Sequence, residues 1–253
     1  MYVVLSYVIV LGIFLVTTLV IWTWYHPESL LIPLNLLYLT DPSPRTNFYT
    51  DSDRNRIFPA GSELEAIWQD IRSEGYSLYD SLPDKNINYL DQYNMNLGAE
   101  TKRNWTTIPL RLFGRDSPDY MSHCPKLTSF LQSHPEIKCC LFSVMEPGKI
   151  IQPHVCPYDG SLRYQLALDI PDTTEGTECY LHVGGEQYHW KNGHGVLFDQ
   201  SSLHGAVNTT QLKRMVLLVD VERPYSLLSY RLLNKLVIKA LGSLPSTKQA
   251  TLL

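Results

Sequence analysis

The sequence predicts a mainly β protein, a jelly-roll barrel of the double-stranded β-helix (cupin-like) kind with flanking helices and an N-terminal transmembrane helix. Residues 162–170 alternate between apolar and polar side chains, which is the two-residue period of a strand with one buried face. Further short apolar segments follow across the turns Gly184-Gly185 and Asn192-Gly193. Short strands joined by tight turns are typical of two packed antiparallel sheets.

Length and charge limit the class of protein. With 253 residues the chain can bury one large core, and its net charge of -4 provides no broad basic field. We therefore expect no nucleic acid partner. The five cysteines form no C-x-x-C pattern and are odd in number, so they leave the redox compartment open.

Residues 1–25 predict a single-pass transmembrane anchor. They hold no Asp, Glu, Lys or Arg, and about 20 apolar residues cross a bilayer. Trp22, Trp24 and Tyr25 would then lie at the membrane interface. A cleaved signal peptide is the alternative, but the basic start and a small-residue cleavage site are both missing.

The side of the membrane stays open, because two features disagree. Arg45, Arg54 and Arg56 follow the anchor, and basic residues favour the cytoplasmic side. Glycosylation sequons at Asn104 and Asn208 would matter only on a lumenal side.

A linker and helices are expected next. Residues 26–58 are predicted to be a juxtamembrane segment and linker. Ser62 and Glu65 form a capping box before an amphipathic helix. Residues 76–120 are expected to form strands and loops, and a short helix is expected to begin at Pro125.

The barrel domain is placed at residues 59–224. On the strand at 162–170 the polar face carries Arg163 and Gln165, and the final strand brings Arg214 into an apolar run. A cation on a hydrophobic strand needs an anion. An internal acid, Asp169 or Asp220, is one candidate for the partner of Arg214.

Residues 225–253 predict an amphipathic helix and tail. Arg231, Lys235 and Lys239 recur at intervals of four beside a leucine-rich face. Such a helix suits a membrane surface, and a helix packed on the domain with a solvated basic face is the alternative.

His154 and His204 are candidate metal ligands, since imidazoles from separate strands suit iron(II) sites with open positions. An Arg follows each of them, nine and ten residues later. Together with the stretches 142–148, 153–164, 198–204 and 214–224, these residues resemble the aspartyl/asparaginyl β-hydroxylase family of iron- and 2-oxoglutarate-dependent dioxygenases. Within it, the chain looks closest to the membrane-bound branch that includes the lipid A 2-hydroxylase.

The resemblance implies the roles of the site residues. His154 and His204 would be catalytic iron ligands, and the carboxylates of 2-oxoglutarate would be bound by Ser143, Arg163, Gln165 and Arg214. Fe(II), 2-oxoglutarate and O2 are the implied cofactors and cosubstrates, with ascorbate as a reductant.

Two positions depart from the family pattern. Gln165 stands where the family usually has His, and its amide can donate a hydrogen bond but cannot carry charge. Cys156 stands where some members have an Asp ligand and others leave the position to water. As a thiol it could pack inertly, ligate the metal or be oxidised.

The predicted function is hydroxylation of an aspartyl or asparaginyl side chain or of a lipid acyl chain. The partners would then be a membrane lipid or a membrane-presented protein. The alternative is a catalytically inactive jelly-roll binding or scaffold protein, which the two departures favour and the two His and two Arg oppose.

Overall fold

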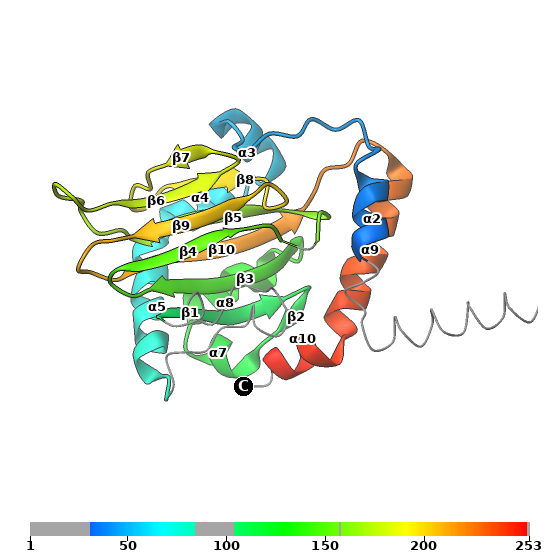
Figure 1. Cartoon of the computed structure of the whole chain (residues 1–253). Helices are drawn as coiled ribbons and strands as arrows, with labels where there is room; N and C mark the ends of the chain where they lie inside the picture. Colours follow the sequence, from blue (N-terminus) through cyan, green and yellow to red (C-terminus); the bar gives the residue numbers. More distant parts are fainter. Residues whose placement is uncertain (1–30, 84–103, 157, 252–253) are drawn as a thin grey trace, which may run out of the picture. The chain divides into compact units, whose positions relative to one another are not determined.

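The computed structural model describes residues 31–83, 104–156 and 158–251 (Figure 1). The predicted anchor at residues 1–25 lies outside these ranges. Among the helices that they contain, none has the length and apolar character needed to cross a membrane. The chain divides between Thr40 and Asp41 into two units, and the described part of the first contains α2 (Leu31–Tyr38).

The second unit is built on two antiparallel sheets. The larger has six strands in the order β2-β1-β3-β10-β5-β8, and the smaller has four in the order β4-β9-β6-β7. The prediction of a mainly β protein with antiparallel sheets is confirmed. The larger sheet contains β1 (Trp105–Leu112), β2 (Arg115–Asp116), β3 (Ile137–Met145), β5 (Ser161–Asp169), β8 (Gly195–Phe198) and β10 (Arg214–Glu222).

The smaller sheet lies against one face of the larger. Its strands are β4 (Lys149–His154), β6 (Cys179–Val183), β7 (Glu186–Tyr188) and β9 (His204–Asn208). The predicted hairpin at Gly184-Gly185 joins β6 to β7, and both glycines have positive φ, 57° and 90°. Gly193, at φ 78°, lies in the turn that takes the chain from β7 to β8 in the larger sheet.

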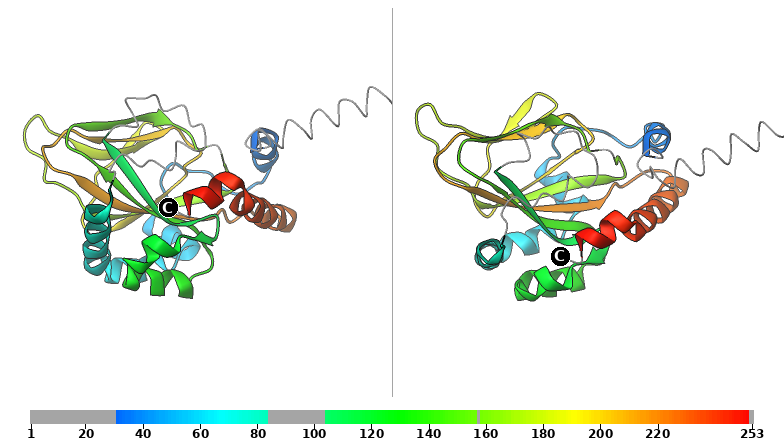
Figure 2. Two further views of the ribbon diagram at one scale, coloured as in Figure 1. Left: turned by 90° about the horizontal axis from the view of Figure 1, so that it is seen from below. Right: turned by 60° about the horizontal axis from the view of Figure 1, so that its bottom comes forward.

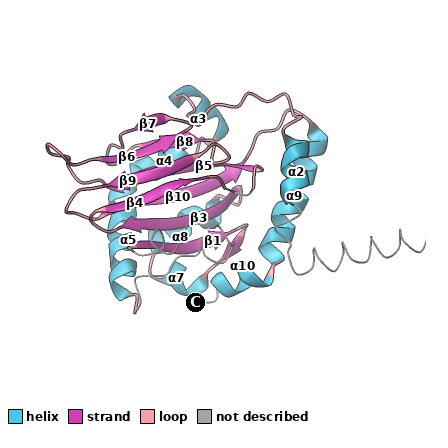
Figure 3. Cartoon of the chain, viewed as in Figure 1, coloured by secondary structure: helices cyan, strands magenta, loops and turns pink. Residues whose placement is uncertain are grey.

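Helices cover the other face of the larger sheet, giving a helix layer and two sheet layers (Figures 2 and 3). The predicted helix after Pro125 is confirmed, with Pro125 in its first turn. The four helices of this layer are α4 (Gly61–Ala66), α5 (Trp68–Ser81), α7 (Pro118–Ser122) and α8 (Pro125–Ser133).

The alternation in β5 separates a packing face from a polar face. Leu162, Tyr164 and Leu166 are fully buried in the core under the helices. Arg163 and Gln165 face the space between the two sheets. Burying one such leucine stabilises the fold by about 1.5–3 kcal/mol, and a slip of one residue would exchange the two faces. The register of β5 therefore fixes where the polar side chains point.

Two local predictions are wrong. Ala60 is the N-cap of α4 and makes no side-chain cap, so Ser62 and Glu65 form no capping box. Glu65 instead accepts hydrogen bonds from the Tyr164 hydroxyl (3.1 Å) and the Gly195 N–H (2.8 Å), because its carboxylate reaches across to the sheet. Helix α5 also continues to Ser81, into a stretch expected to hold strands and loops.

Part of the segment predicted as a linker joins the sheet. Phe48 forms an antiparallel bridge with Phe198, and the Tyr49 N–H donates to the Leu197 carbonyl at 2.9 Å. Helix α3 (Asp51–Ile57) follows, capped by the Thr50 side chain, which accepts from the Asp53 N–H. These contacts cover the edge of β8, which would otherwise expose unpaired backbone groups.

The C-terminal helix is present as α9 (Leu228–Ser243), followed by α10 (Pro245–Ala250). Its buried Asn234 donates to the Gly160 carbonyl at 2.8 Å and accepts from the Tyr158 hydroxyl. The helix is therefore tied to the β4–β5 connection, which follows His154.

A buried ion-pair network holds that same connection. Arg223 bonds to Asp199 through both nitrogens Nη1 (2.9 Å) and Nη2 (2.6 Å), and Nη2 also reaches Asp159 at 2.9 Å. Arg45 adds a bidentate contact to Asp159. Burial opposes ionisation of Asp199, but the hydrogen bonds and charge of Arg223 outweigh it and lower the pKa of Asp199 from its usual 3.8.

Arg223→Met is expected to lower the free energy of unfolding by about 3–5 kcal/mol, because Asp199 stays buried without its counter-charge, while Asp159 keeps only its pair with Arg45. Ionised Asp199 stabilises the fold fully at a pH above 3.8, its pKa in the unfolded chain. This stabilisation is lost as the pH falls from 3.8 through the lower pKa that Asp199 has in the folded protein. Denaturant unfolding of the full chain in detergent at pH 7 and pH 3.5 measures both effects.

The exposed Arg56 pairs with Asp53 on the surface and provides the control. Arg56→Met should leave the unfolding midpoint unchanged. An equal loss of unfolding free energy in Arg223→Met and Arg56→Met would contradict the assigned role of the network. A stability difference between Arg223→Met and the parent that is larger at pH 3.5 than at pH 7 would also contradict it.

Candidate active site

Two histidines face each other across neighbouring strands of the smaller sheet. His154 ends β4 and His204 begins β9, and the two are direct partners in the antiparallel register. Their ring centroids are 4.4 Å apart. The Nδ1 atom of His154 bonds to the Gln152 carbonyl at 2.9 Å, and that of His204 to the Ser202 carbonyl at 2.8 Å.

These two hydrogen bonds fix which nitrogen can bind a metal. A carbonyl only accepts, so each Nδ1 must carry the hydrogen, and the lone pair of the neutral ring lies on Nε2. The Nε2 atom of His204 is buried and has no hydrogen-bond partner within the described ranges. Burial and the nearby His154 and Arg163 charges lower the pKa of His204 to about 3, so its ring is neutral at neutral pH.

Arg214 is a buried cation without an acidic partner. Its side chain is 2% exposed, and its Nε and Nη1 atoms bond to nothing in the part of the chain that the structure describes. The guanidinium lies over the Trp190 ring at 4.7 Å, and Nη2 contacts the Met145 sulfur. Burial lowers the pKa of Arg214 to about 10, which leaves it charged at neutral pH.

The two acids considered as partners for Arg214 are engaged elsewhere. Asp220 forms a bidentate pair with Arg163, at 2.7 Å and 2.8 Å. Asp169 accepts from Arg72 at 3.0 Å and from the Tyr76 hydroxyl. An internal salt bridge therefore does not explain why Arg214 is buried.

Two tryptophans orient polar side chains near Arg214. The Trp105 Nε1–H donates to the Ser143 hydroxyl oxygen at 3.0 Å, and the Trp190 Nε1–H donates to Gln165 Oε1 at 3.2 Å. An indole N–H only donates, so Ser143 and Gln165 each accept with oxygen. The Ser143 O–H and the Gln165 amide N–H groups are thereby left to donate.

One small cavity between the sheets, with a volume of about 30 Å³, is lined by all the predicted site residues and is partly open to solvent. Arg163 lines it as well, although Asp220 already neutralises its charge. The roles of these residues stay predictions. The six side chains are Ser143, His154, Arg163, Gln165, His204 and Arg214.

Cys156 is half-buried and lies beside Arg163. Burial raises the pKa of its thiol to about 11, although the charge of Arg163 opposes this, so the group is a neutral thiol. No cluster of three or more His, Cys, Asp or Glu side chains that could hold a metal occurs among the described residues. The structure therefore brings two histidines together and does not add Cys156 to them.

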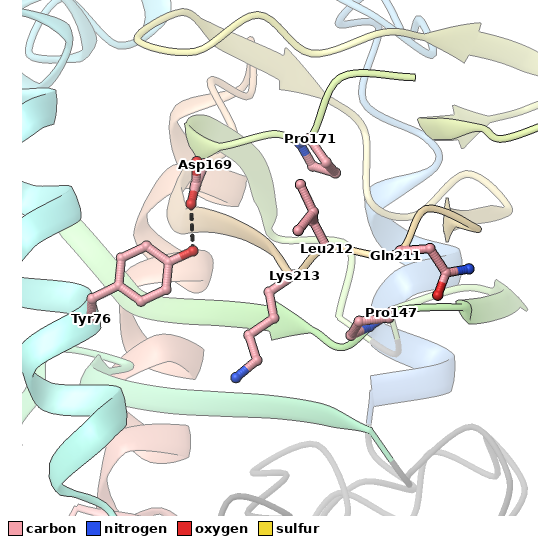
Figure 4. Close-up of a pocket in the computed structure, with 7 residues that line it drawn as sticks. All are labelled: Tyr76, Pro147, Asp169, Pro171, Gln211, Leu212 and Lys213. Carbon is pink, nitrogen blue, oxygen red and sulfur yellow. Dashed lines mark hydrogen bonds between the residues drawn. The ribbon is translucent and has the colours of Figure 1, made fainter. Parts of the chain in front are cut away.

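A second cavity lies on the surface near the end of β5 and is lined in part by Tyr76, Asp169 and Lys213 (Figure 4). Its charged groups are already partnered, since Asp169 accepts from Tyr76 and Lys213 lies 3.6 Å from Glu146. This cavity offers a ligand no buried, unpaired charge in the way that Arg214 does.

The residues present fit an iron and dicarboxylate site. Two neutral imidazoles are ligands that suit iron(II). An unpaired guanidinium beside hydroxyl and amide hydrogen-bond donors suits a carboxylate.

The sequence did not reveal the roles of Trp105 and Trp190, because their hydrogen-bond partners lie 38 and 25 residues away and meet them only in the folded protein. Neither tryptophan carries a signal of this role in the sequence.

The fold and the cavity define a two-sheet β protein with a candidate metal site beside a carboxylate site. The chain belongs to the aspartyl/asparaginyl β-hydroxylase family, whose family model matches residues 65–224. The matched region contains all six predicted site residues.

Two characterised relatives are each 30% identical to the chain. One is an ornithine lipid ester-linked acyl 2-hydroxylase of Rhizobium tropici, aligned over 168 residues, 66% of this chain and 58% of that protein. The other is the human aspartyl/asparaginyl β-hydroxylase, aligned over 166 residues, 64% of this chain and 21% of that protein. The chain therefore spans little more than half of the first relative and about a fifth of the second.

Solved structures show more distant similarity. A 2OG-Fe(II) oxygenase-family oxidoreductase from Burkholderia pseudomallei has a TM-score of 0.36 and 15% identity, covering 48% of this chain and 66% of that one. A cupin 2 conserved barrel protein from Salinispora arenicola has a TM-score of 0.33 and 15% identity, covering 61% and 95%.

Arg214→Met is expected to raise the free energy of unfolding by about 1–3 kcal/mol without ligand, since it removes an uncompensated buried charge. The same variant should lose the stabilisation that 2-oxoglutarate gives to the parent chain. Thermal unfolding with and without 2-oxoglutarate measures both effects. Arg56→Met, an exposed arginine, is the control, and a destabilised Arg214→Met that 2-oxoglutarate still protects would contradict the assignment.

Trp190→Phe keeps an aromatic ring over Arg214 but removes the N–H that orients Gln165. We expect 2-oxoglutarate to bind about fivefold more weakly, the cost of one hydrogen bond, with iron binding unchanged. Titration of the iron-loaded chain with 2-oxoglutarate measures the affinity. Trp68→Phe, on α5, is the matched control and should bind as the parent does. Unchanged affinity in Trp190→Phe would show that Gln165 is oriented by other contacts.

Proposed function

We propose that this chain is an Fe(II)- and 2-oxoglutarate-dependent hydroxylase built on a double-stranded β-helix. The observation that carries the proposal is the burial of Arg214 with two unpartnered nitrogens, on the same cavity as two histidines. A buried guanidinium needs a counter-charge, and a carboxylate of the cosubstrate supplies one.

His154 and His204 would hold the iron through Nε2. The Gln152 and Ser202 carbonyls keep each ring in the required tautomer and orientation. The low pKa of His204 keeps this nitrogen free of a proton over the physiological range. Iron(II) with 2-oxoglutarate, when bound, supplies O2 activation and hydroxylation of an unreactive C–H bond, with succinate and carbon dioxide as coproducts.

Three side chains would hold 2-oxoglutarate. Arg214 offers Nε and Nη1 to one carboxylate, and the Ser143 hydroxyl donates beside it. Gln165 adds amide N–H donors in place of a charged imidazole, which weakens but does not remove the contact. Arg163 is paired with Asp220, so we assign it to shaping the cavity and not to binding a carboxylate.

The metal would keep open positions for the cosubstrate and O2. Two protein ligands leave these positions free, and the neutral thiol of Cys156 lies toward Arg163. We therefore propose that solvent, and not Cys156, takes the position that a carboxylate fills in other members. The two sheets on either side of the cavity would limit the access of bulk water to the reacting atoms.

The substrate that we favour is a lipid acyl chain. The residues next to the two histidines, Val155 and Leu203, are 51% and 55% exposed, which gives the surface beside the site an apolar character. A relative acts on the acyl chain of ornithine lipid, as its name states. An N-terminal membrane anchor would bring the domain to such a substrate, and the anchor remains part of the proposal.

Succinate formation from 2-oxoglutarate tests the proposal. The detergent-solubilised full chain is assayed with Fe(II) and ascorbate, alone, with membrane lipid extract, and with a peptide that contains Asp and Asn. We expect stimulation by the lipid extract, and a loss of at least about 100-fold in His204→Ala, because a ligand of the metal is removed.

His123→Ala is the matched control, since His123 is exposed and lies outside the cavity. Its activity should equal that of the parent chain. If only the peptide stimulates succinate formation, the substrate is a protein side chain and not a lipid. A folded chain that forms no succinate and binds no iron would reject the enzyme and favour a binding or scaffold role.

A further inference from the structure

Helix α9 presents a stripe of leucines to solvent. Leu228, Leu232 and Leu236 recur every fourth residue and are 66%, 54% and 66% exposed. Residues four apart lie on one face of an α-helix, so these side chains form a continuous apolar strip. Large apolar side chains gathered on one exposed face mark a surface that contacts something other than water.

A basic strip runs directly beside the leucines. Arg231, Lys235 and Lys239 are also spaced by four and exposed, and each lies within one turn of a leucine of the strip. Residues 223–253 contain no Asp or Glu, although the chain as a whole has a net charge of -4. This C-terminal segment therefore has a net positive charge, whereas the rest of the chain is net negative.

The opposite face of α9 is packed on the domain. Asn234, Ile238 and Leu241 are buried, and Asn234 bonds to the Gly160 carbonyl. The helix therefore already has a buried face, and the leucine strip is additional to it. A helix that only covers the domain needs one apolar face, whereas α9 has two.

We propose that the exposed face of α9 docks on an anionic lipid surface. Leucines enter the boundary between headgroups and acyl chains, while the neighbouring lysines and arginine reach the anionic headgroups. A second copy of this chain fits less well, since a two-fold contact through this face would oppose its own basic strips. The proposal rests on the surface of α9 and holds whether or not the chain is a hydroxylase.

Docking of α9 would also orient the candidate site. Asn234 and Arg223 bind Gly160 and Asp159, which lie just before β5, the strand that carries Arg163 and Gln165. The helix on the lipid would thus be tied to a strand that lines the candidate site. A membrane-held substrate would meet the site from a fixed direction.

A fluorescent reporter on α9 tests the docking. Leu236→Cys is labelled with an environment-sensitive dye in the full chain, which is then reconstituted in neutral phosphatidylcholine vesicles or in vesicles with phosphatidylglycerol. Four native cysteines are buried and Cys156 is half-buried, so the parent chain gives the labelling background. We expect a blue shift and at least about threefold less quenching by aqueous iodide in anionic vesicles only.

Leu212→Cys is the matched control, because Leu212 is 63% exposed and lies on the turn before β10. Its dye should stay accessible to iodide in both kinds of vesicle. Reversing two charges, Lys235→Glu with Lys239→Glu, should remove the protection at position 236. Equal iodide quenching at positions 236 and 212 in anionic vesicles would overturn the proposal. Protection of position 236 in neutral vesicles that rises with protein concentration would also overturn it, because it would indicate contact with a second copy of the chain.

Discussion

The candidate site depends on one unsatisfied interaction, the burial of the Arg214 guanidinium without an anion. The charge lies in a low-dielectric space where an unpaired ion is costly, and the acids that could neutralise it are bound to Arg163, Arg72 and Tyr76. Stacking on Trp190 provides only part of the missing stabilisation. In the proposed function, a carboxylate of the cosubstrate would supply the missing anion.

The two-sheet architecture creates this space. Strand β10 lies between β3 and β5 in the larger sheet. One of its faces packs under the helices, and the face that carries Arg214 is directed at the smaller sheet. The smaller sheet brings His154 and His204 to the same space from the opposite side. Strand register and the packing of the two sheets therefore place the candidate metal ligands opposite the candidate carboxylate-binding residues.

Much of the fold and of the candidate site could be predicted from the sequence. The two-residue period of β5 and β10 places Arg163, Gln165 and Arg214 on the same face of the larger sheet. The hairpin at Gly184-Gly185 is equally local, since turn chemistry fixes it. Pairings between distant residues could not be predicted. The sequence around Glu65 does not indicate that its carboxylate accepts a hydrogen bond from Tyr164 and makes no helix cap. The sequence around Trp190 does not indicate that its N–H orients Gln165.

A crystal structure of the protein grown without oxygen, with iron(II) and 2-oxoglutarate, would reveal which anion Arg214 binds. We expect the metal on the Nε2 atoms of His154 and His204, and a carboxylate of 2-oxoglutarate bound to Nε and Nη1 of Arg214. Arg214 paired with a protein acid in that crystal, or 2-oxoglutarate bound away from the cavity between the sheets, would contradict the proposed site.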